Sequence, residues 1–198
     1  MRSTRKLNST RRSLASVSAG FAMCLIALFS APTAMAQTPP TSATSLVTVV
    51  VAGTPLKMSP AMAAKVSSPE GFATLSPGEL AAVGIGPGMH EKGVPAATAG
   101  GGGVIPMSSS GCNSLVCIYI TGTGLKVTDW DTSAGYYSYL CTYAAFWNGS
   151  RILTTSNTVC TTGPFFAVWG VTRNYVPGTQ LCNTWVGISG RPCETIHS

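Results

Sequence analysis

The positions of the cysteines constrain this chain more than any other feature. Cys24 lies in the apolar stretch near the N-terminus, and the other six all lie in the second half of the 198 residues. An even number of cysteines behind a secretion signal is typical of a disulfide framework. The sequence therefore predicts an exported protein with a disulfide-stapled C-terminal domain. The six candidate disulfide residues are Cys112, Cys117, Cys141, Cys160, Cys182 and Cys193.

The first 36 residues have the three parts of a secretory signal peptide. Basic residues precede an apolar run over about residues 14–29, and an A-x-A cleavage motif stands before Gln37. The run is too short for a stable membrane anchor. Residues 10–14 match a twin-arginine signal in part, which leaves two export routes open. We expect residues 1–36 to be a signal peptide and the mature protein to be secreted and extracellular.

Removal of that peptide changes the charge. The whole chain has 12 basic and six acidic residues, a net charge of +6. Five of the 12 basic residues lie in the first 36 positions, so seven basic residues remain against six acidic ones. A nucleic-acid partner requires a concentrated basic surface. The near-neutral mature chain therefore predicts no nucleic-acid partner.

Aromatic residues divide the mature chain into two parts. Every Trp and Tyr lies at or after Tyr119, and Phe72 is the only aromatic residue between Gln37 and Ser110. A segment with few large side chains buries too little apolar area to order its backbone alone. We predict an arm and linker over residues 37–103 and the stapled domain over residues 104–198. The flexible part of the linker is expected within residues 93–110, which are rich in Gly and Ser.

The arm contains three short patterned pieces. Residues 46–51 are β-prone, and residues 59–66 and 76–85 predict two short helices, the second with a capping box. Each piece is too short to be stable alone, so the otherwise extended arm should fold against its own C-terminal domain or another protein. Strand addition to a partner would satisfy the exposed strand; the alternative is a spacer or a removed propeptide. The candidate partner-binding residues are Val47, Val49, Val51, Leu56, Leu80, Val83 and Ile85.

Beyond residue 105 the apolar residues alternate at the period of β-strands. Six or seven short strands, separated by turn pairs such as Asn148-Gly149, predict an all-β sandwich or small barrel. Sequence alone does not select a cysteine pairing, but cysteines that flank turns are the easiest to bridge. The expected pairs are Cys112–Cys117, Cys141–Cys160 and Cys182–Cys193.

The ionisable residues predict no catalytic site. His90 lies in the arm and His197 next to the last residue, and both are poorly placed for a preorganised triad. Asp129 and Asp131 alternate onto one strand face. Such a pair can serve a glycosidase or bind a cation, but the preferred interpretation is a solvated strand face. We expect no enzymatic activity, no metal and no cofactor.

Tyrosines are the most promising candidates for a contact surface. They cluster in a Gly- and Ser-containing loop, and strand alternation cannot bury all of them. Exposed tyrosine is typical of surfaces that bind proteins or sugars. The candidate residues of the β domain are Tyr136, Tyr137, Tyr139 and Tyr175.

Two segments of the stapled domain carry a family pattern. Residues 111–118 (GCNSLVCI) are followed by residues 122–127 (GTGLKV) and Trp130. This resembles the GCN-x-x-VCI and G-x-G-L-x-V pattern of small secreted actinobacterial proteins. With the preceding arm, it is similar to the UmbB adaptor subunits of umbrella toxin particles. The resemblance implies that the arm docks on a large toxin subunit, that the β domain holds a lectin-type subunit, and that the particle acts against competing bacteria.

The expected function is therefore that of a secreted, non-enzymatic adaptor that joins two other secreted proteins. Two other classes remain open. A stand-alone module that binds cell wall or glycan, or inhibits a protease, would use the loop with Tyr136 and Tyr139. A secreted hydrolase would use a pocket around Asp129 or Asp131.

Overall fold

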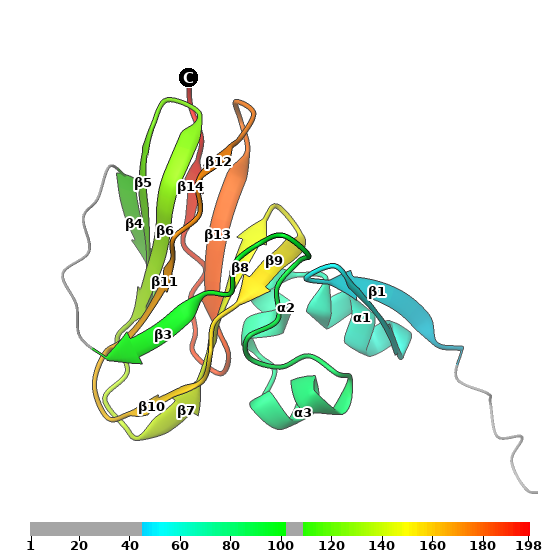
Figure 1. Ribbon diagram of the computed structural model, residues 1–198. Coiled ribbons are helices and arrows are strands. Elements are labelled where there is room, and N and C mark those ends of the chain that lie inside the picture. Colours follow the sequence, from blue (N-terminus) through cyan, green and yellow to red (C-terminus); the bar gives the residue numbers. More distant parts are fainter. Residues whose placement is uncertain (1–44, 102–108) are drawn as a thin grey trace, which may run out of the picture. The chain divides into compact units, whose positions relative to one another are not determined.

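The computed structural model describes residues 45–101 and 109–198 (Figure 1). The predicted signal peptide, the start of the predicted arm and the middle of the predicted linker lie outside these ranges. The described residues belong to one compact unit that extends over Ser42–Ser198.

Two antiparallel sheets pack face to face, which confirms the predicted all-β sandwich. One sheet has the strand order β3-β11-β6-β5-β4, with β12 also paired to β6, and the other has the order β14-β13-β8-β9. Two-stranded sheets are formed by β1 with β2 and by β7 with β10. The strands are β1 Val47–Val51, β2 Thr54–Met58, β3 Thr98–Gly101, β4 Ser109–Asn113, β5 Val116–Thr123, β6 Lys126–Ala134, β7 Leu140–Thr142, β8 Ala144–Asn148, β9 Arg151–Thr155, β10 Val159–Thr161, β11 Phe165–Trp169, β12 Arg173–Asn174, β13 Gln180–Trp185 and β14 Cys193–Thr195.

The sandwich core is the apolar cluster between the inner faces of the two large sheets. It contains Trp130, Trp169, Trp185, Phe146 and Phe165, all fully buried. The rings of Trp130, Phe146 and Trp169 contact one another, with centroids 5.3 to 5.6 Å apart. These side chains come from alternate positions of their strands, as the strand period predicts.

Two indole hydrogen bonds join the large sheets in opposite directions. Trp130 of β6 donates from Nε1 to Oδ1 of Asn183 in β13 at 2.8 Å. Trp185 of β13 donates from Nε1 to Oγ1 of Thr132 in β6 at 3.2 Å. All four residues are buried, so each bond gives a buried indole N–H the partner that it needs in the core.

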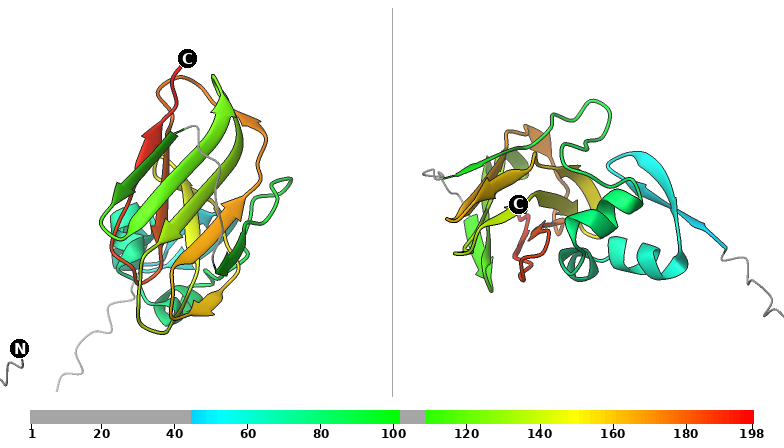
Figure 2. Two further views of the ribbon diagram at one scale, coloured as in Figure 1. Left: turned by 90° about the vertical axis from the view of Figure 1, so that its left-hand side faces the viewer. Right: turned by 90° about the horizontal axis from the view of Figure 1, so that it is seen from below.

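The N-terminal segment, defined here as residues 45–97, forms a third layer. It consists of the β1–β2 hairpin, three short helices and the chain up to β3 (Figure 2). Each helix begins with proline after a serine whose side-chain oxygen accepts a backbone N–H, and Ser76 with Glu79 forms the predicted capping box. The sequence predicted two of these helices and missed the middle one. They are α1 Pro60–Val66, α2 Pro69–Ala73 and α3 Pro77–Ala82.

The outer core is the apolar cluster between the N-terminal segment and the outer face of the four-stranded sheet. Phe72 of α2 lies edge-on to Trp147 of β8, with ring centroids 5.3 Å apart. Trp147 in turn donates from Nε1 to Oγ1 of Thr184 at 2.9 Å. Residues 45–97 thus pack on the protein's own β domain, one of the two options that the sequence left open for the arm.

The N-terminal segment and strand β3 also pair with sheet edges that would otherwise be exposed, those of β9 and β11. Thr155 of β9 donates its N–H to the carbonyl of Met89 at 2.7 Å, and Glu91 donates to the carbonyl of Leu153 at 3.3 Å. Strand β3 pairs with the edge of β11. Covered edges cannot pair with other chains. The predicted linker, residues 93–110, contains strand β3 and the first two residues of β4, whose Gly and Ser residues gave no strand pattern.

All three disulfides join directly opposite residues of neighbouring strands, and the predicted local pairing is confirmed. Three such bonds indicate an oxidising, extracytoplasmic compartment. Among the residues described, no helix is long and apolar enough to span a membrane. The bonds are Cys112–Cys117 between β4 and β5, Cys141–Cys160 between β7 and β10, and Cys182–Cys193 between β13 and β14.

Candidate functional site

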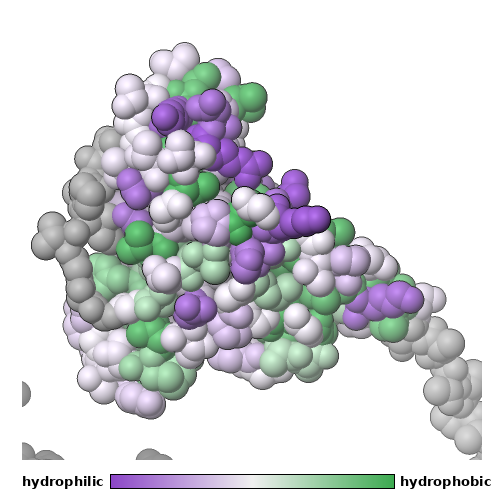
Figure 3. All heavy atoms as spheres, viewed as in Figure 1, coloured by the Kyte–Doolittle hydropathy of each residue, from purple (hydrophilic) through white to green (hydrophobic). Residues whose placement is uncertain are grey.

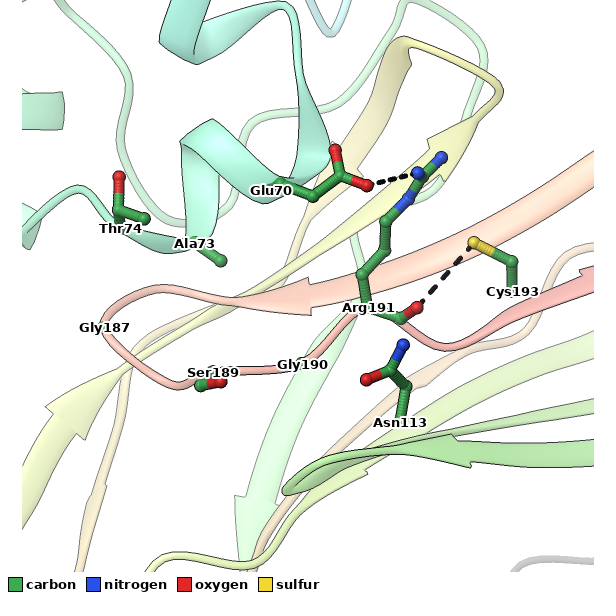
Figure 4. Close-up of a pocket in the computed structure, with 9 residues that line it drawn as sticks. All are labelled: Glu70, Ala73, Thr74, Asn113, Gly187, Ser189, Gly190, Arg191 and Cys193. Atoms are coloured by element: carbon green, nitrogen blue, oxygen red, sulfur yellow. Dashed lines mark hydrogen bonds and ion pairs between the residues drawn. The ribbon is translucent and has the colours of Figure 1, made fainter.

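A pocket of about 590 Å³ lies where α2 meets the loop between β13 and β14 (Figure 4). The loop approaches the end of β4 so closely that a Cβ at Gly190 would lie 2.3 Å from the carbonyl oxygen of Asn113. Glycine is therefore required at this position, which is one of those that line the pocket. The lining residues are Glu70, Ala73, Thr74, Asn113, Gly187, Ser189, Gly190, Arg191 and Cys193.

One ion pair and one backbone hydrogen bond connect the two sides of this pocket. Arg191 Nη1 lies 2.5 Å from Glu70 Oε1, and Gly187 donates its N–H to the carbonyl of Ala73 at 3.2 Å. The pKa of Glu70 is held below its usual value by its backbone amide and by the hydrogen bonds from Arg191 and Ser68. Both contacts tie the N-terminal segment to the β domain.

The pocket offers hydroxyl and amide groups but no activated nucleophile. Thr74 donates its hydroxyl to the carbonyl of Gly71 at 2.7 Å, and neither His90 nor His197 lines the pocket. A nucleophilic hydroxyl requires a base within hydrogen-bond reach. Across residues 45–101 and 109–198, no group of three or more His, Cys, Asp or Glu could hold a metal ion.

Asp131 differs from the expectation of a solvated strand face. Its side chain is only 3% exposed, and its Oδ1 has no hydrogen-bond partner. Burial, and then the nearby negative charge of Asp129, raise the pKa of Asp131 to about 6, although the backbone of Trp169 offers it a hydrogen bond. Strand alternation predicts that Asp129 and Asp131 share one face of β6, but it gives no information about which residues cover that face.

The tyrosine loop, residues 135–139 between β6 and β7, presents the two most exposed aromatic side chains of the β domain. Tyr137 is 85% exposed and Tyr139 is 69% exposed, whereas Tyr136 is half-buried against the sandwich core. Two residues after Tyr139 comes Cys141, whose disulfide to Cys160 joins β7 to β10. Two exposed rings therefore stand on a support that is covalently cross-linked.

Tyr175 does not belong to that surface. It is buried in the sandwich core, and burial raises the pKa of its hydroxyl to about 12. Arg173 lies over its ring, 5.6 Å from the centroid. The prediction that Tyr175 contacts a partner is not supported by this position, because its ring packs inside the protein.

The predicted contact residues of the arm are distributed between the interior and the surface. Val51, Leu80 and Ile85 are fully buried in the outer core, and Val49, Leu56 and Val83 pack against it. Their apolar pattern is explained by the protein's own fold. Val47 is exposed.

Sequence reasoning missed two further exposed apolar residues beside Val47. Leu46 is 61% exposed and Val50 is 54% exposed, both at the hairpin. Figure 3 shows apolar residues next to hydrophilic ones on this part of the surface. The signal that could have identified Val50 is strand alternation, because Val49 and Val51 face the outer core and Val50 must face away.

Comparison of the chain with protein-family models, curated proteins and solved structures gives no match. Two surfaces therefore carry the functional argument, namely the tyrosine loop and the exposed side of the hairpin.

Proposed function

We propose that this protein is a secreted, extracellular, non-enzymatic adaptor that holds two other secreted proteins together. The observation that carries the proposal is the tyrosine loop, where Tyr137 and Tyr139 are exposed beside a disulfide. Tyrosine supplies a large contact area at a low entropic cost, which is why exposed tyrosine is enriched at protein interfaces. A cross-linked support lowers the ordering cost further.

The partners that we propose follow from the resemblance in residues 111–130. A lectin-type subunit would bind the tyrosine loop, and a large toxin subunit would bind the N-terminal segment through its exposed side. The assembled particle would act on competing bacteria. Because Val51, Leu80 and Ile85 are buried, the proposed contact residues of this segment reduce to the exposed ones of the hairpin, namely Leu46 and Val50 on its outer side and Val47 at the start of β1.

The test is affinity capture from the producer's culture supernatant with tagged wild-type protein and a Tyr137→Ala/Tyr139→Ala variant as baits. We expect the wild type to retain a defined lectin-type partner and the variant to lose it, while a large toxin subunit stays bound to both. The matched control is Val176→Ala, because Val176 is also exposed but follows β12, which pairs with the opposite end of β6.

Two outcomes would contradict the proposal. If the wild-type bait retains no protein, the adaptor assignment is wrong. If soluble cell-wall glycan then binds the wild type and not the double variant, the protein is a stand-alone glycan-binding module.

A further inference from the structure

The two edges of the β1–β2 hairpin differ in their ability to pair with another strand. Ala52 and Gly53 form its two-residue turn, with φ values of 45° and 73°. Two positive values define a type I′ turn, in which the flanking residues form a hydrogen-bonded pair. Val51 pairs with Thr54, and bonded and non-bonded pairs then alternate along the ladder.

This alternation determines which backbone groups point away from the hairpin. Val49 and Val47 bond to β2, whereas Thr48 and Val50 direct their N–H and C=O groups to the free edge of β1. Pro55 lies opposite Val50, so the position without an N–H falls where no ladder bond is lost. The position of proline in the sequence is therefore consistent with the hydrogen-bond register of the hairpin.

The edge of β2 is closed to strand addition, and the edge of β1 is open. Pro55 removes an outward donor from β2, and Lys57 adds a charge; both are devices that protect sheet edges. Residues 45–51 contain no charge, no Pro and no Gly. Within the described ranges β2 is the only strand paired with β1. An open, uncharged, valine-rich edge readily pairs with another chain.

We propose that β1 pairs with β1 of a second copy of this chain, antiparallel and around a two-fold axis at Thr48. In this register Leu46 lies opposite Val50 of the second copy, and Thr48 lies opposite its own counterpart. The two exposed apolar residues thus cover each other, and the two threonines form a favourable polar cross-strand pair. The absence of charged residues from residues 45–51 favours this pairing, because a charged side chain at the two-fold axis would lie opposite the same charge of the second copy and repel it.

The size of the contact sets its strength. Three pairs of outward-facing residues exchange about six backbone hydrogen bonds, and the strand buries less than about 1,000 Å² in total. Interfaces of this size are weak. We therefore infer a concentration-dependent dimer with a dissociation constant on the order of 100 µM. The register ends before Ala52, whose N–H already donates to the carbonyl of Ile152 at 3.1 Å.

The dimer would cover Leu46 and Val50, the same exposed residues that the proposed function gives to the large toxin subunit, so the second copy and that subunit would compete for the hairpin. The inference does not depend on the proposed adaptor function. It rests on the hairpin alone. A monomeric protein could still be an adaptor, and a dimer could form in a protein that captures no lectin.

Sedimentation velocity of the mature chain from about 5 to about 500 µM tests the dimer. We expect the wild type to shift from monomer to dimer over this range. Val50→Pro should stay monomeric, because it removes an outward N–H without removing a bond to β2. Val50→Thr, which keeps that N–H, is the matched control and should still dimerise.

A charge pair tests the register independently of any folding defect in the proline variant. Thr48→Lys and Thr48→Glu should each remain monomeric, because like charges at the axis oppose each other. An equimolar mixture of the two should dimerise, because the lysine of one copy then faces the glutamate of the other. A wild type that stays monomeric at every concentration overturns the proposal. So does a dimer that Val50→Pro and both Thr48 variants leave intact.

Discussion

The sandwich core and the outer core both bury large aromatic side chains, yet their backbones are held in different ways. The sandwich core lies between two sheets whose strands are held by backbone ladders and by two of the three disulfides. The outer core is closed by helices of seven, five and six residues, which are too short to persist without tertiary contacts. Equal burial therefore does not mean equal local stability.

The largest expected effect comes from deleting one phenylalanine in each core. Phe146 and Phe72 are both fully buried, and Phe→Ala in a core costs about 3–5 kcal/mol. We expect Phe146→Ala to lower the global free energy of unfolding by that amount. Phe72→Ala should instead release α1 to α3 while the strands stay protected, which hydrogen exchange with mass spectrometry can resolve. If Phe72→Ala lowers the hydrogen-exchange protection of the strands as much as that of the helices, the N-terminal segment and the sandwich unfold as one cooperative unit.

The second effect is a pH dependence of the free energy of unfolding, which arises from Asp131 in β6. The pKa of Asp131 in the folded protein is about 6, above its ordinary value of 3.8, so the folded state holds this proton more tightly than the unfolded state. The stabilisation that protonated Asp131 gives to the folded state is therefore fully present below the ordinary pKa and is lost as the pH rises through about 6. The loss is at most about 3 kcal/mol.

Asp131→Asn isolates that contribution. Relative to the wild type, the variant should gain stability at pH 8 and gain little at pH 4, as measured by urea unfolding. Asp129→Asn is the control and should give a smaller gain, since it removes only the neighbouring charge. If both variants follow the wild-type pH profile, Asp131 does not titrate in this range.

A third effect separates the packing of α1 and α2 from helix propensity. A Cβ at Gly71 would lie 2.7 Å from the carbonyl oxygen of Lys65, whereas a Cβ at Gly78 would meet nothing within 4 Å. Gly71→Ala should cost about 1–3 kcal/mol through overpacking. Gly78→Ala should be neutral or stabilise by up to about 1 kcal/mol. Thermal unfolding of the two variants compares them, and equal melting temperatures would contradict the close approach.

The smallest effect concerns the ion pair beside the pocket. Glu70 and Arg191 are partly exposed, and such pairs contribute roughly 0–1 kcal/mol. A double-mutant cycle with Glu70→Gln and Arg191→Gln should give a coupling energy in that range. The coupling should decrease in high salt, and the hydrogen exchange of α2 should rise accordingly. A salt-independent coupling would point to packing of the Arg191 stem.

The sandwich was predictable because its signals are local. Alternation in residues 116–120 and 125–130 placed the inner faces, and Asn148-Gly149 marked a hairpin that the structure contains between β8 and β9. Cys112–Cys117 and Cys182–Cys193 flank the connections between consecutive paired strands, which explains why those two local pairs were predictable. Cys141 and Cys160 instead lie on β7 and β10, which pair across the intervening β8–β9 hairpin.

The outer core was harder to predict, although one signal was present. Residues 143–147 read Tyr-Ala-Ala-Phe-Trp, and all five are buried. A continuous apolar run is typical of a strand that is covered on both faces. It indicated that another layer packs on β8, and Phe72, the only aromatic residue between Gln37 and Ser110, was the large side chain of the preceding segment that could provide it.

The candidate surfaces were predicted only in part. Tyr137 and Tyr139 lie in a loop where nothing requires burial, so composition was sufficient to identify them. The burial of Tyr175 and Asp131, and the pocket between Glu70 and Arg191, depend on which segments meet in space. Residues far apart in the chain carry no local pattern for that.

The pattern of disulfides has a consequence for how the chain matures. Each bond spans a sequence separation of only 5, 19 or 11 residues and joins strands that are already neighbours. Each crosslink therefore depends only on the pairing of its own two strands, and none ties the N-terminal layer to the sandwich. Correct oxidation of the β domain thus requires no contact with the N-terminal layer.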